Sequence, residues 1–243
     1  TDAGVTWDAQ DSGVIEPIRR VAFRGRTDGW AVGEGGLVLH TVDAGETWTR
    51  ERVGSQDTYF DIHVPASGRM WIAGDYAAAY ASDDGGATWE RRSEGLRRAS
   101  LRAVSFVDDD TGWVGTWDGR IYHTTDGGKL WQRQVLPPTV SRAEITRLWF
   151  TDRLHGFAIG DSRALLVTDD GGDSWTHVTE GSNERHNTTY GQTRRPGDEP
   201  LHSFMLYDVA MAGPAMWLVG DMGAVLHSPD RGATWRHQLG GPT

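Results

Sequence analysis

Short runs of β-branched and aromatic residues alternate with clusters of glycine and aspartate along the whole chain. Runs of this kind, bounded by turn-forming residues, are typical of β-strands and not of amphipathic helices. In the first part of the chain the pattern predicts strands at about residues 19–24, 30–33, 37–41 and 47–52, and corresponding segments follow in each later part. An all-β fold is therefore expected.

One octet recurs between the third and fourth predicted strands, with a pattern close to Ser/Thr-x-Asp-x-Gly-x-Thr-Trp. Full copies stand at residues 41–48, 82–89, 124–131, 168–175 and 228–235, and a truncated copy stands at residues 2–7. In such a turn the aspartate accepts backbone N–H hydrogen bonds, the glycine adopts a positive φ, and the tryptophan enters the next strand. We therefore assign a structural role to the aspartates of the octets, which are Asp2, Asp43, Asp84, Asp126, Asp170 and Asp230.

The octet tryptophans are spaced by 41, 41, 42, 44 and 60 residues, so one repeat unit is about 41 residues long. A four-stranded unit of this length is typical of a β-propeller blade, in which neighbouring blades bury each other's faces. The sequence predicts one propeller domain over residues 1–243, with five antiparallel four-stranded blades at about residues 18–56, 57–97, 98–138, 139–180 and 203–241. An orphan N-terminal strand follows the truncated octet, at residues 6–10, and is either an additional outer strand or part of a blade whose remainder is absent.

The long interval before the last octet contains an insertion at residues 181–202, which is rich in Gly, Asn, Arg, Thr and Pro. The insertion joins a fourth strand to the next first strand, so it is expected to project from the end of the propeller opposite the octets. It is either a lid or docking arm or a plain surface loop.

Composition and charge exclude several classes of function. The chain has no cysteine, which excludes disulfide scaffolds, zinc knuckles, iron–sulfur clusters and thiol nucleophiles. Its net charge is −10 with one lysine, so binding to a nucleic acid backbone is not expected. No apolar run approaches the ~20 residues that cross a bilayer, so no transmembrane segment is expected. No metal site or cofactor is expected, and the absence of a signal-like run at Thr1 suggests a processed or excised chain and an extracytoplasmic location.

Candidate functional residues are sought where the repeat is broken. Trp117 stands at the hairpin between the second and third strands, where the other units carry a carboxylate. It either caps a binding surface or packs on a neighbouring loop. Trp149 is the other tryptophan outside the periodic positions.

Charged residues supply two further candidate sites. Arg20, Asp61, Arg147 and Asp208 share one register on the first strands, which line the channel of a propeller. They either pair with one another or form an anion-binding mouth in which the arginines act as bidentate donors. A second group, Arg97, Arg98 and Arg102 with their neighbours Arg91 and Arg92, suits an acidic protein surface or an anionic lipid headgroup, or is a solvated loop.

The octets match the Asp-box repeat, also called the bacterial neuraminidase repeat. Together with the segment Gly29-Trp-Ala-Val-Gly33 and the Leu-His-Thr sequence that leads into the octet, they resemble the photosystem II stability and assembly factor family over nearly the whole chain. The resemblance implies a propeller that binds a protein partner without chemistry of its own, with a basic patch as the partner-binding region. The family usually has more than five blades, so the way this ring closes is left open.

Two classes of function follow. The first is a non-catalytic binding or assembly scaffold that engages a protein partner through the face opposite the Asp boxes. The second is a glycan-active propeller, namely a sialidase-like or xyloglucanase-like glycoside hydrolase or a lectin, because other Asp-box propellers have these functions. Asp61 and Asp208 would then supply the two carboxyl groups of a hydrolase. The scaffold is preferred because the chain lacks the sialidase set of arginine triad, tyrosine and glutamate, and has room for one propeller where the xyloglucanase type uses two.

Overall fold

Five antiparallel sheets of four strands make up the described part of the chain, which in this computed structural model comprises residue 6 and residues 8–66, 68–140, 142–161, 164–178, 206–213, 215–220, 223–232 and 234–238. Blade one comprises β1 (Ile18–Arg24), β2 (Asp28–Gly33), β3 (Val38–Thr41) and β4 (Thr49–Glu51). Blade two comprises β5 (Tyr59–His63), β6 (Met70–Gly74), β7 (Ala78–Ser82) and β8 (Glu90–Arg91), and blade three comprises β9 (Leu101–Phe106), β10 (Gly112–Thr116), β11 (Ile121–Thr124) and β12 (Gln132–Arg133). Blade four comprises β13 (Ile145–Phe150), β14 (Gly156–Gly160), β15 (Leu165–Thr168) and β16 (Thr176–His177), and blade five comprises β17 (Leu206–Ala212), β18 (Ala215–Gly220), β19 (Val225–Ser228) and β20 (Arg236–His237). Within each blade the strands pair in chain order. The predicted all-β propeller with five four-stranded blades is confirmed.

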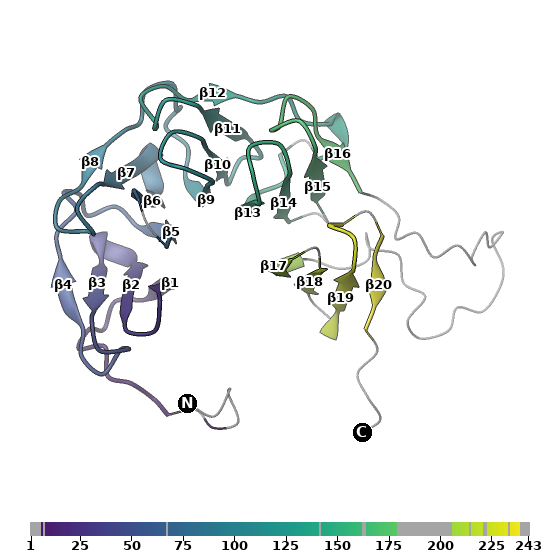
Figure 1. Ribbon diagram of the computed structural model, residues 1–243. Coiled ribbons are helices and arrows are strands. Elements are labelled where there is room, and N and C mark those ends of the chain that lie inside the picture. The colour runs from purple at the N-terminus through teal and green to yellow at the C-terminus, as the bar shows by residue number, and fades with distance from the viewer. Residues whose placement is uncertain are drawn as a thin grey trace, which may run out of the picture.

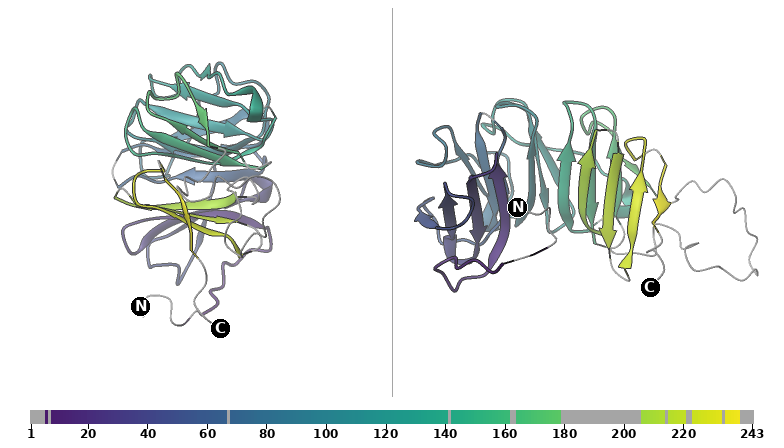
Figure 2. Two further views of the ribbon diagram at one scale, coloured as in Figure 1. Left: turned by 90° about the vertical axis from the view of Figure 1, so that its right-hand side faces the viewer. Right: turned by 60° about the horizontal axis from the view of Figure 1, so that its bottom comes forward.

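The blades stand around a common axis as an open ring, with the first strand of each blade nearest the axis and the fourth at the rim (Figure 1). Blades one and five border the opening in Figure 1, and Figure 2 shows the same sheets from two other sides. Because each octet connects a third strand to a fourth, the octets lie at one end of the blades, which we call the box end. The hairpins between second and third strands, and the links between blades, lie at the opposite end.

Short 3-10 turns occur at that opposite end. The turns η1 (Glu34–Gly36) and η2 (Asp75–Ala77) close the hairpins between the second and third strands of blades one and two. A third turn, η3 (Pro138–Val140), lies in the link before β13. These turns and links therefore shape the surface opposite the boxes.

The Asp boxes fold as the local chemistry predicts. In the box of blade one, Asp43 accepts hydrogen bonds from the Thr47 backbone N–H at 2.9 Å and from the Thr47 hydroxyl at 2.6 Å. The Thr41 hydroxyl donates to Asp43 at 2.7 Å and accepts from the Gly45 N–H at 2.9 Å. The same pattern of bonds holds the boxes of Asp84, Asp170 and Asp230, and Asp126 has all but the bond from a side-chain hydroxyl.

These bonds make the box carboxylates unusually strong acids. Hydrogen bonds from the side chain and then the backbone of Ser174, followed by the Thr168 hydroxyl, lower the pKa of Asp170 to about 2. A carboxylate whose pKa is lower in the folded than in the unfolded state stabilises the fold above the unfolded value of about 3.9. That contribution is lost as the pH falls from about 4 towards about 2.

Replacing Asp170 by Asn is therefore expected to lower stability at neutral pH and to remove part of the stability loss between pH 4 and pH 2. In the folded protein one Asp170 oxygen accepts from the Ser174 N–H and the Thr168 hydroxyl, and the other oxygen accepts from the Ser174 hydroxyl. The amide keeps the shape of the side chain, but its NH₂ group cannot accept, so the bonds to one of the two positions are lost. Urea unfolding at a series of pH values measures the change, and an NMR titration of the Asp170 carboxyl measures its midpoint. The matched control is Asp169→Asn, one residue earlier and exposed; equal pH profiles for the two variants would show that the box bonds do not set the acid response.

Tryptophan sandwiches hold neighbouring blades together. Trp71 on the second strand of blade two stacks on Phe106 of blade three, with ring centroids 4.2 Å apart, and Trp131 of the blade-three box meets both rings edge-on at 5.9 Å. Gly128 of that box lies directly over Trp71, where an added Cβ would come closer than 3.0 Å to the ring. The box of each blade is therefore part of the interface with the preceding blade.

The same arrangement recurs between blades three and four. Trp113 stacks on Phe150, which meets Trp175 edge-on at 5.9 Å, and the Trp113 indole N–H donates to the Gly171 carbonyl at 2.9 Å. Trp71 and Trp113 are fully buried. Burial of side chains of this size is a main source of stability in a protein interior.

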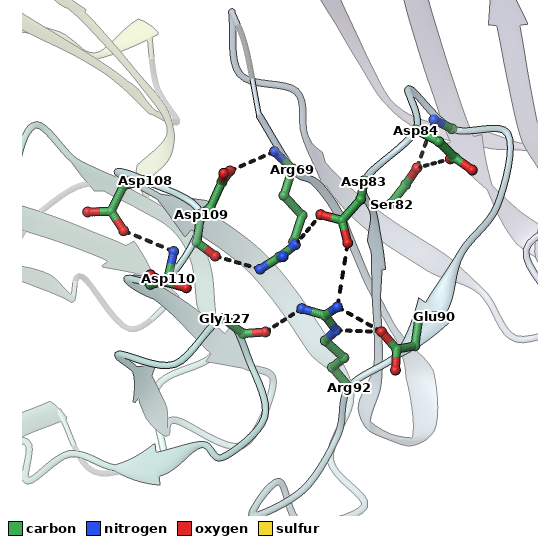
Figure 3. A network of polar contacts seen from close by, with 11 residues as sticks. Arg69, Ser82, Asp83, Asp84, Glu90, Arg92, Asp108, Asp109, Asp110 and Gly127 are labelled. Carbon is green, nitrogen blue, oxygen red and sulfur yellow. Dashed lines mark hydrogen bonds and ion pairs between the residues drawn. The ribbon is translucent and has the colours of Figure 1, made fainter.

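A polar network joins blades two and three at the box end (Figure 3). The Arg69 backbone N–H donates to the Asp109 carboxylate at 2.8 Å, and its guanidinium donates to the Asp109 carbonyl at 2.7 Å and to Asp83 at 2.6 Å. Arg92 donates to the Gly127 carbonyl at 2.9 Å. Each arginine thus connects one blade to a loop of the next.

Three features predicted from the sequence remain predictions. Thr6 and residues 8–10 carry no assigned strand, so the orphan strand stays a prediction. Asp2 and the insertion at residues 181–202 lie outside the described residues.

Candidate functional site

The four charged residues of the first strands form a chain of ion pairs across the axis. Arg20 lies 3.3 Å from Asp61 on β5 and 3.5 Å from Asp208 on β17. Arg147 on β13 lies 3.1 Å from the other Asp208 oxygen. Of the two sequence alternatives for these residues, the described structure therefore shows mutual pairing, with each arginine facing a carboxylate.

Asp61 is the buried member of this chain. Its carboxylate accepts hydrogen bonds from the Val104 N–H at 2.9 Å and from the Ile62 N–H at 3.0 Å. Burial raises the pKa of the Asp61 carboxyl, while the positive charge of Arg20 acts in the opposite direction. Asp61 thus connects blade two to Val104 of blade three and to Arg20 of blade one, so its contacts are those of a structural residue.

The two non-periodic tryptophans lie at different places. Trp117, in the hairpin between β10 and β11, is 55% exposed, and its backbone N–H donates to the Ser100 carbonyl at 3.0 Å. Trp149 is partly exposed on β13, two residues after Arg147, so both side chains leave the same face of the strand. Trp149 therefore borders the axial ion pairs, and Trp117 belongs to the end opposite the boxes.

The predicted arginine cluster separates into two groups. Arg102 is engaged internally, with Nε 3.1 Å from the Glu144 carboxylate and the guanidinium 3.7 Å above the Phe60 ring. Arg91 donates to the Tyr76 carbonyl at 2.7 Å, and Arg92 belongs to the network of Figure 3.

Arg97 and Arg98 are exposed and make no ion pair within the described residues. The link that carries them, residues 97–100, runs between two hairpins. On one side the Ala77 N–H donates to the Ala99 carbonyl at 2.8 Å, and on the other side Trp117 bonds to Ser100. The guanidinium groups of Arg97 and Arg98, which have no ion-pair partner among the described residues, therefore lie next to the hairpin that carries Trp117.

Tyr76 is a surface residue that the sequence analysis missed. Its side chain is 66% exposed in η2, and its φ is 53°. At the corresponding position of blade one, Gly35 has a similar φ of 64°. The available signal was an aromatic residue where another unit carries glycine. Tyr76, Arg97, Arg98 and Trp117 together form what we call the aromatic–arginine patch, at the end of blades two and three opposite the boxes.

The described residues include no group of three or more His, Asp or Glu side chains placed to hold a metal ion. They also include no helix long and apolar enough to span a bilayer.

The fold and its turns define the class of protein: a β-propeller built from Asp-box repeats. The family described as photosynthesis system II assembly factor YCF48 matches at residues 51–141 and 139–239. Because these matches cover most of the chain, the protein belongs to this family, as the resemblance of its repeats predicted.

Individual relatives agree with this assignment. The photosystem II assembly lipoprotein Ycf48 of Synechococcus sp. (strain CC9902) is 34% identical over 86 residues, which is 35% of this chain and 21% of that protein. The alignment thus spans about a fifth of the curated relative. A solved structure described as YCF48 bound to D1 peptide matches with a TM-score of 0.50 and 21% identity, over 96% of this chain and 84% of the relative.

Enzymes with the same architecture are more distant in sequence. The GH74 xyloglucanase from Xanthomonas campestris matches with a TM-score of 0.63 over 91% of this chain and 38% of the enzyme, at 13% identity. At this identity the likeness concerns the fold alone.

Proposed function

We propose that this chain is a non-catalytic assembly scaffold that acts outside the cytoplasm and binds a segment of a partner protein at the end opposite the Asp boxes. The aromatic–arginine patch carries the proposal. It combines two exposed aromatic rings with two arginines whose charge is not neutralised by any described ion pair. Aromatic residues and arginine are the side chains most enriched at the energetic centres of protein interfaces.

The patch favours a partner segment that carries carboxylates between apolar side chains. Each guanidinium can bind a carboxylate through two hydrogen bonds, and the rings of Tyr76 and Trp117 offer apolar contact on either side. Family membership supports the same reading, since a solved YCF48 relative is described as bound to a D1 peptide. The extracytoplasmic placement rests on the name of the Synechococcus relative, which is a lipoprotein.

Charge reversal of the patch tests the proposal. In fluorescence anisotropy with a labelled D1 peptide, and in pull-downs from native envelope extract, the double variant Arg97→Glu/Arg98→Glu is expected to bind at least tenfold more weakly, because two favourable charge interactions become repulsive. Trp117→Ala is expected to weaken binding by roughly tenfold or more, as is typical of an aromatic residue at the centre of an interface. Circular dichroism verifies that each variant is folded.

The matched control is Arg26→Glu, an exposed arginine in the turn between β1 and β2 at the box end. Arg26→Glu changes the net charge in the same direction as the double arginine variant, by half as much, but lies on the other side of the propeller. If Arg26→Glu loses half as much binding free energy as the double variant, the effect comes from net charge and the patch is not the binding site.

No described contact favours the glycan-active alternative. Both candidate carboxylates, Asp61 and Asp208, face the guanidinium of Arg20, which links them. Hydrolysis assays on sialosides and β-glucans belong beside the binding experiment. Turnover that disappears in Asp208→Asn would replace the scaffold proposal with a glycoside hydrolase.

A further inference from the structure

The hairpin between β6 and β7 holds two consecutive residues other than glycine in the left-handed region. Tyr76 has a φ of 53° and Ala77 a φ of 56°. The corresponding hairpin of blade one has Gly35 and Gly36 there, with φ values of 64° and 70°. A side chain makes this conformation unfavourable because its Cβ crowds the following carbonyl oxygen, whereas glycine adopts it without strain. The hairpin of blade two therefore carries a backbone strain that the hairpin of blade one avoids.

The Tyr76 side chain does not compensate for this strain by packing. Tyr76 is 66% exposed, and within the described part of the chain its hydroxyl group makes no hydrogen bond and its ring makes no aromatic contact. Blade one forms the same turn with glycine, so the fold does not require a tyrosine. Strained residues persist only where surrounding contacts fix them, and they cluster at binding and catalytic sites. The strain therefore points to a role for the exposed ring in binding.

Side chains of blade two fix the strained hairpin. The Arg91 guanidinium, at the end of β8, donates to the Tyr76 carbonyl at 2.7 Å. The Ser93 hydroxyl donates to the Ala77 carbonyl at 2.7 Å, and the Ala77 N–H donates to the Ala99 carbonyl at 2.8 Å. Both carbonyl groups of the strained pair are thus held by a side chain.

The glycine hairpin of blade one lacks these bonds. Arg50 stands two residues after its box tryptophan, as Arg91 does, but its guanidinium donates to Glu16 at 2.8 Å. No described residue donates a hydrogen bond to the carbonyls of Gly35 and Gly36. The bond from the arginine therefore accompanies the tyrosine, and it fixes the backbone from which the exposed ring projects.

The strained hairpin lies directly beside the link of residues 97–100. The hydrogen bond from the Ala77 N–H joins the hairpin to this link, which carries Arg97 and Arg98. A basic side chain of a partner placed on the Tyr76 ring would be repelled by the two arginines. An apolar side chain can pack on the ring while a neighbouring carboxylate of the partner binds a guanidinium.

We infer that Tyr76 is a specificity-determining residue for an apolar side chain of the partner segment, and that Arg91 is the positioning residue that holds the Tyr76 hairpin in its binding conformation. A ring whose backbone is already fixed loses less conformational freedom on binding, so the bond from Arg91 increases the affinity. The inference rests on the proposed function, because Tyr76 belongs to the aromatic–arginine patch.

Three substitutions of Tyr76 separate the ring from its backbone. In the anisotropy assay with the same labelled peptide, Tyr76→Ala and Tyr76→Gly are each expected to bind about fivefold more weakly or less tightly still, because the ring is lost. Tyr76→Phe is expected to bind like the parent chain, since the hydroxyl group has no described partner. Tyr76→Gly is also expected to raise Tm by roughly 2–4 °C, because glycine relieves the strain.

The matched control is Ala44→Gly. Ala44 is an exposed residue in the box of blade one with a φ of 64°, so the substitution relieves a similar strain at the other end of the propeller without changing charge. Ala44→Gly is expected to raise Tm and to leave peptide binding unchanged. Circular dichroism verifies that every variant is folded.

A double-mutant cycle tests the role of Arg91. Arg91→Ala is expected to weaken peptide binding about threefold in the parent chain and by less than about 1.5-fold in the Tyr76→Ala background. Loss of a positive charge or a general structural effect would weaken binding equally in both backgrounds. Arg91→Lys, which can still donate to the Tyr76 carbonyl, is expected to retain most of the affinity.

An alanine scan of the labelled peptide tests the chemistry of the partner side chain. Replacing one apolar residue of the peptide is expected to lower its affinity for the parent chain about fivefold, and its affinity for Tyr76→Ala by less than about twofold. Coupling of Tyr76 to a basic or acidic residue of the peptide, or to no residue, overturns the inference.

The outcomes distinguish this inference from the proposed function. Undiminished binding by Tyr76→Ala together with weaker binding by Arg97→Glu/Arg98→Glu overturns the inference and leaves the proposed function standing. Undiminished binding by all variants of the patch overturns both, and so does a failure of the parent chain to bind. A fall in Tm for Tyr76→Gly overturns the strain argument, and equal effects of Arg91→Ala in the two backgrounds overturn the assignment of Arg91.

Discussion

Gly128→Ala is expected to lower the free energy of unfolding by about 2–5 kcal/mol, the sum of overpacking in a filled interior and a left-handed backbone carrying a side chain. Gly128 has a φ of 74°, and its added Cβ would lie within 3.0 Å of the Trp71 ring. Trp71 cannot withdraw, because it is fully buried and stacked on Phe106 at 4.2 Å. Thermal and urea unfolding followed by fluorescence measure the loss, and Tm should fall by roughly 10 °C.

Gly35→Ala is the matched control for this variant. Its φ of 64° is similar, but no atom lies within 4 Å of the added Cβ. Gly35→Ala therefore carries the backbone penalty alone, about 1 kcal/mol or slightly more. Equal losses of unfolding free energy for the two variants would show that the close contact between Gly128 and the Trp71 indole does not affect stability.

Trp71→Ala is expected to destabilise the protein by about 3–5 kcal/mol, the usual loss for removing a buried aromatic side chain. The indole ring stacks on Phe106 and meets Trp131 edge-on, so its removal leaves a cavity between blades two and three. The buried rings of Phe106 and Trp131 limit how far the surrounding residues can move into that cavity. Urea unfolding measures the loss of stability, and loss of near-ultraviolet circular dichroism reports the loss of fixed aromatic packing.

Trp217→Ala provides the comparison at the same position of a different blade. Trp217 is partly exposed, so its removal is expected to reduce stability by less than half as much as Trp71→Ala. Equal losses would show that the Trp217 indole is packed as tightly as the Trp71 indole.

A double variant separates packing from backbone strain. In Trp71→Ala/Gly128→Ala the new methyl group enters the space that the indole vacated, so the two losses should sum to more than the loss measured for the pair. An additive result would mean that Gly128 acts through its φ alone.

The outcome for the charged residues shows how far sequence reasoning reaches. The alignment of repeats placed Arg20, Asp61, Arg147 and Asp208 in one register but left open whether they pair or bind an anion. The structure shows pairing, because Arg20 reaches Asp61 in blade two and Asp208 in blade five. Asp61 and Asp208 are far from Arg20 in sequence. A repeat pattern predicts which residues face the axis, but it does not predict which of them come into contact across it.

The arginine cluster shows that even neighbouring positions in the sequence can have different surroundings in the fold. Arg98 and Arg102 are four residues apart. Only the packing of blade four against blade three brings Glu144 to Arg102, and only the packing of blade two brings Phe60 beneath it. The sequence analysis did not single out Tyr76, because its position beside the link of residues 97–100 depends on how one blade joins the next.

The all-β class, the length of the repeat, the five blades and the Asp-box turns could all be predicted from the amino-acid sequence. These properties follow from local chemistry: a turn aspartate, a glycine with positive φ and alternating apolar residues act over a few positions, and the repeat multiplies their signal. The sequence did not indicate which of the described arginines form ion pairs, which tryptophans are covered or where the ring is open. Those properties depend on contacts between blades, and such contacts join residues about one repeat apart or at opposite ends of the chain.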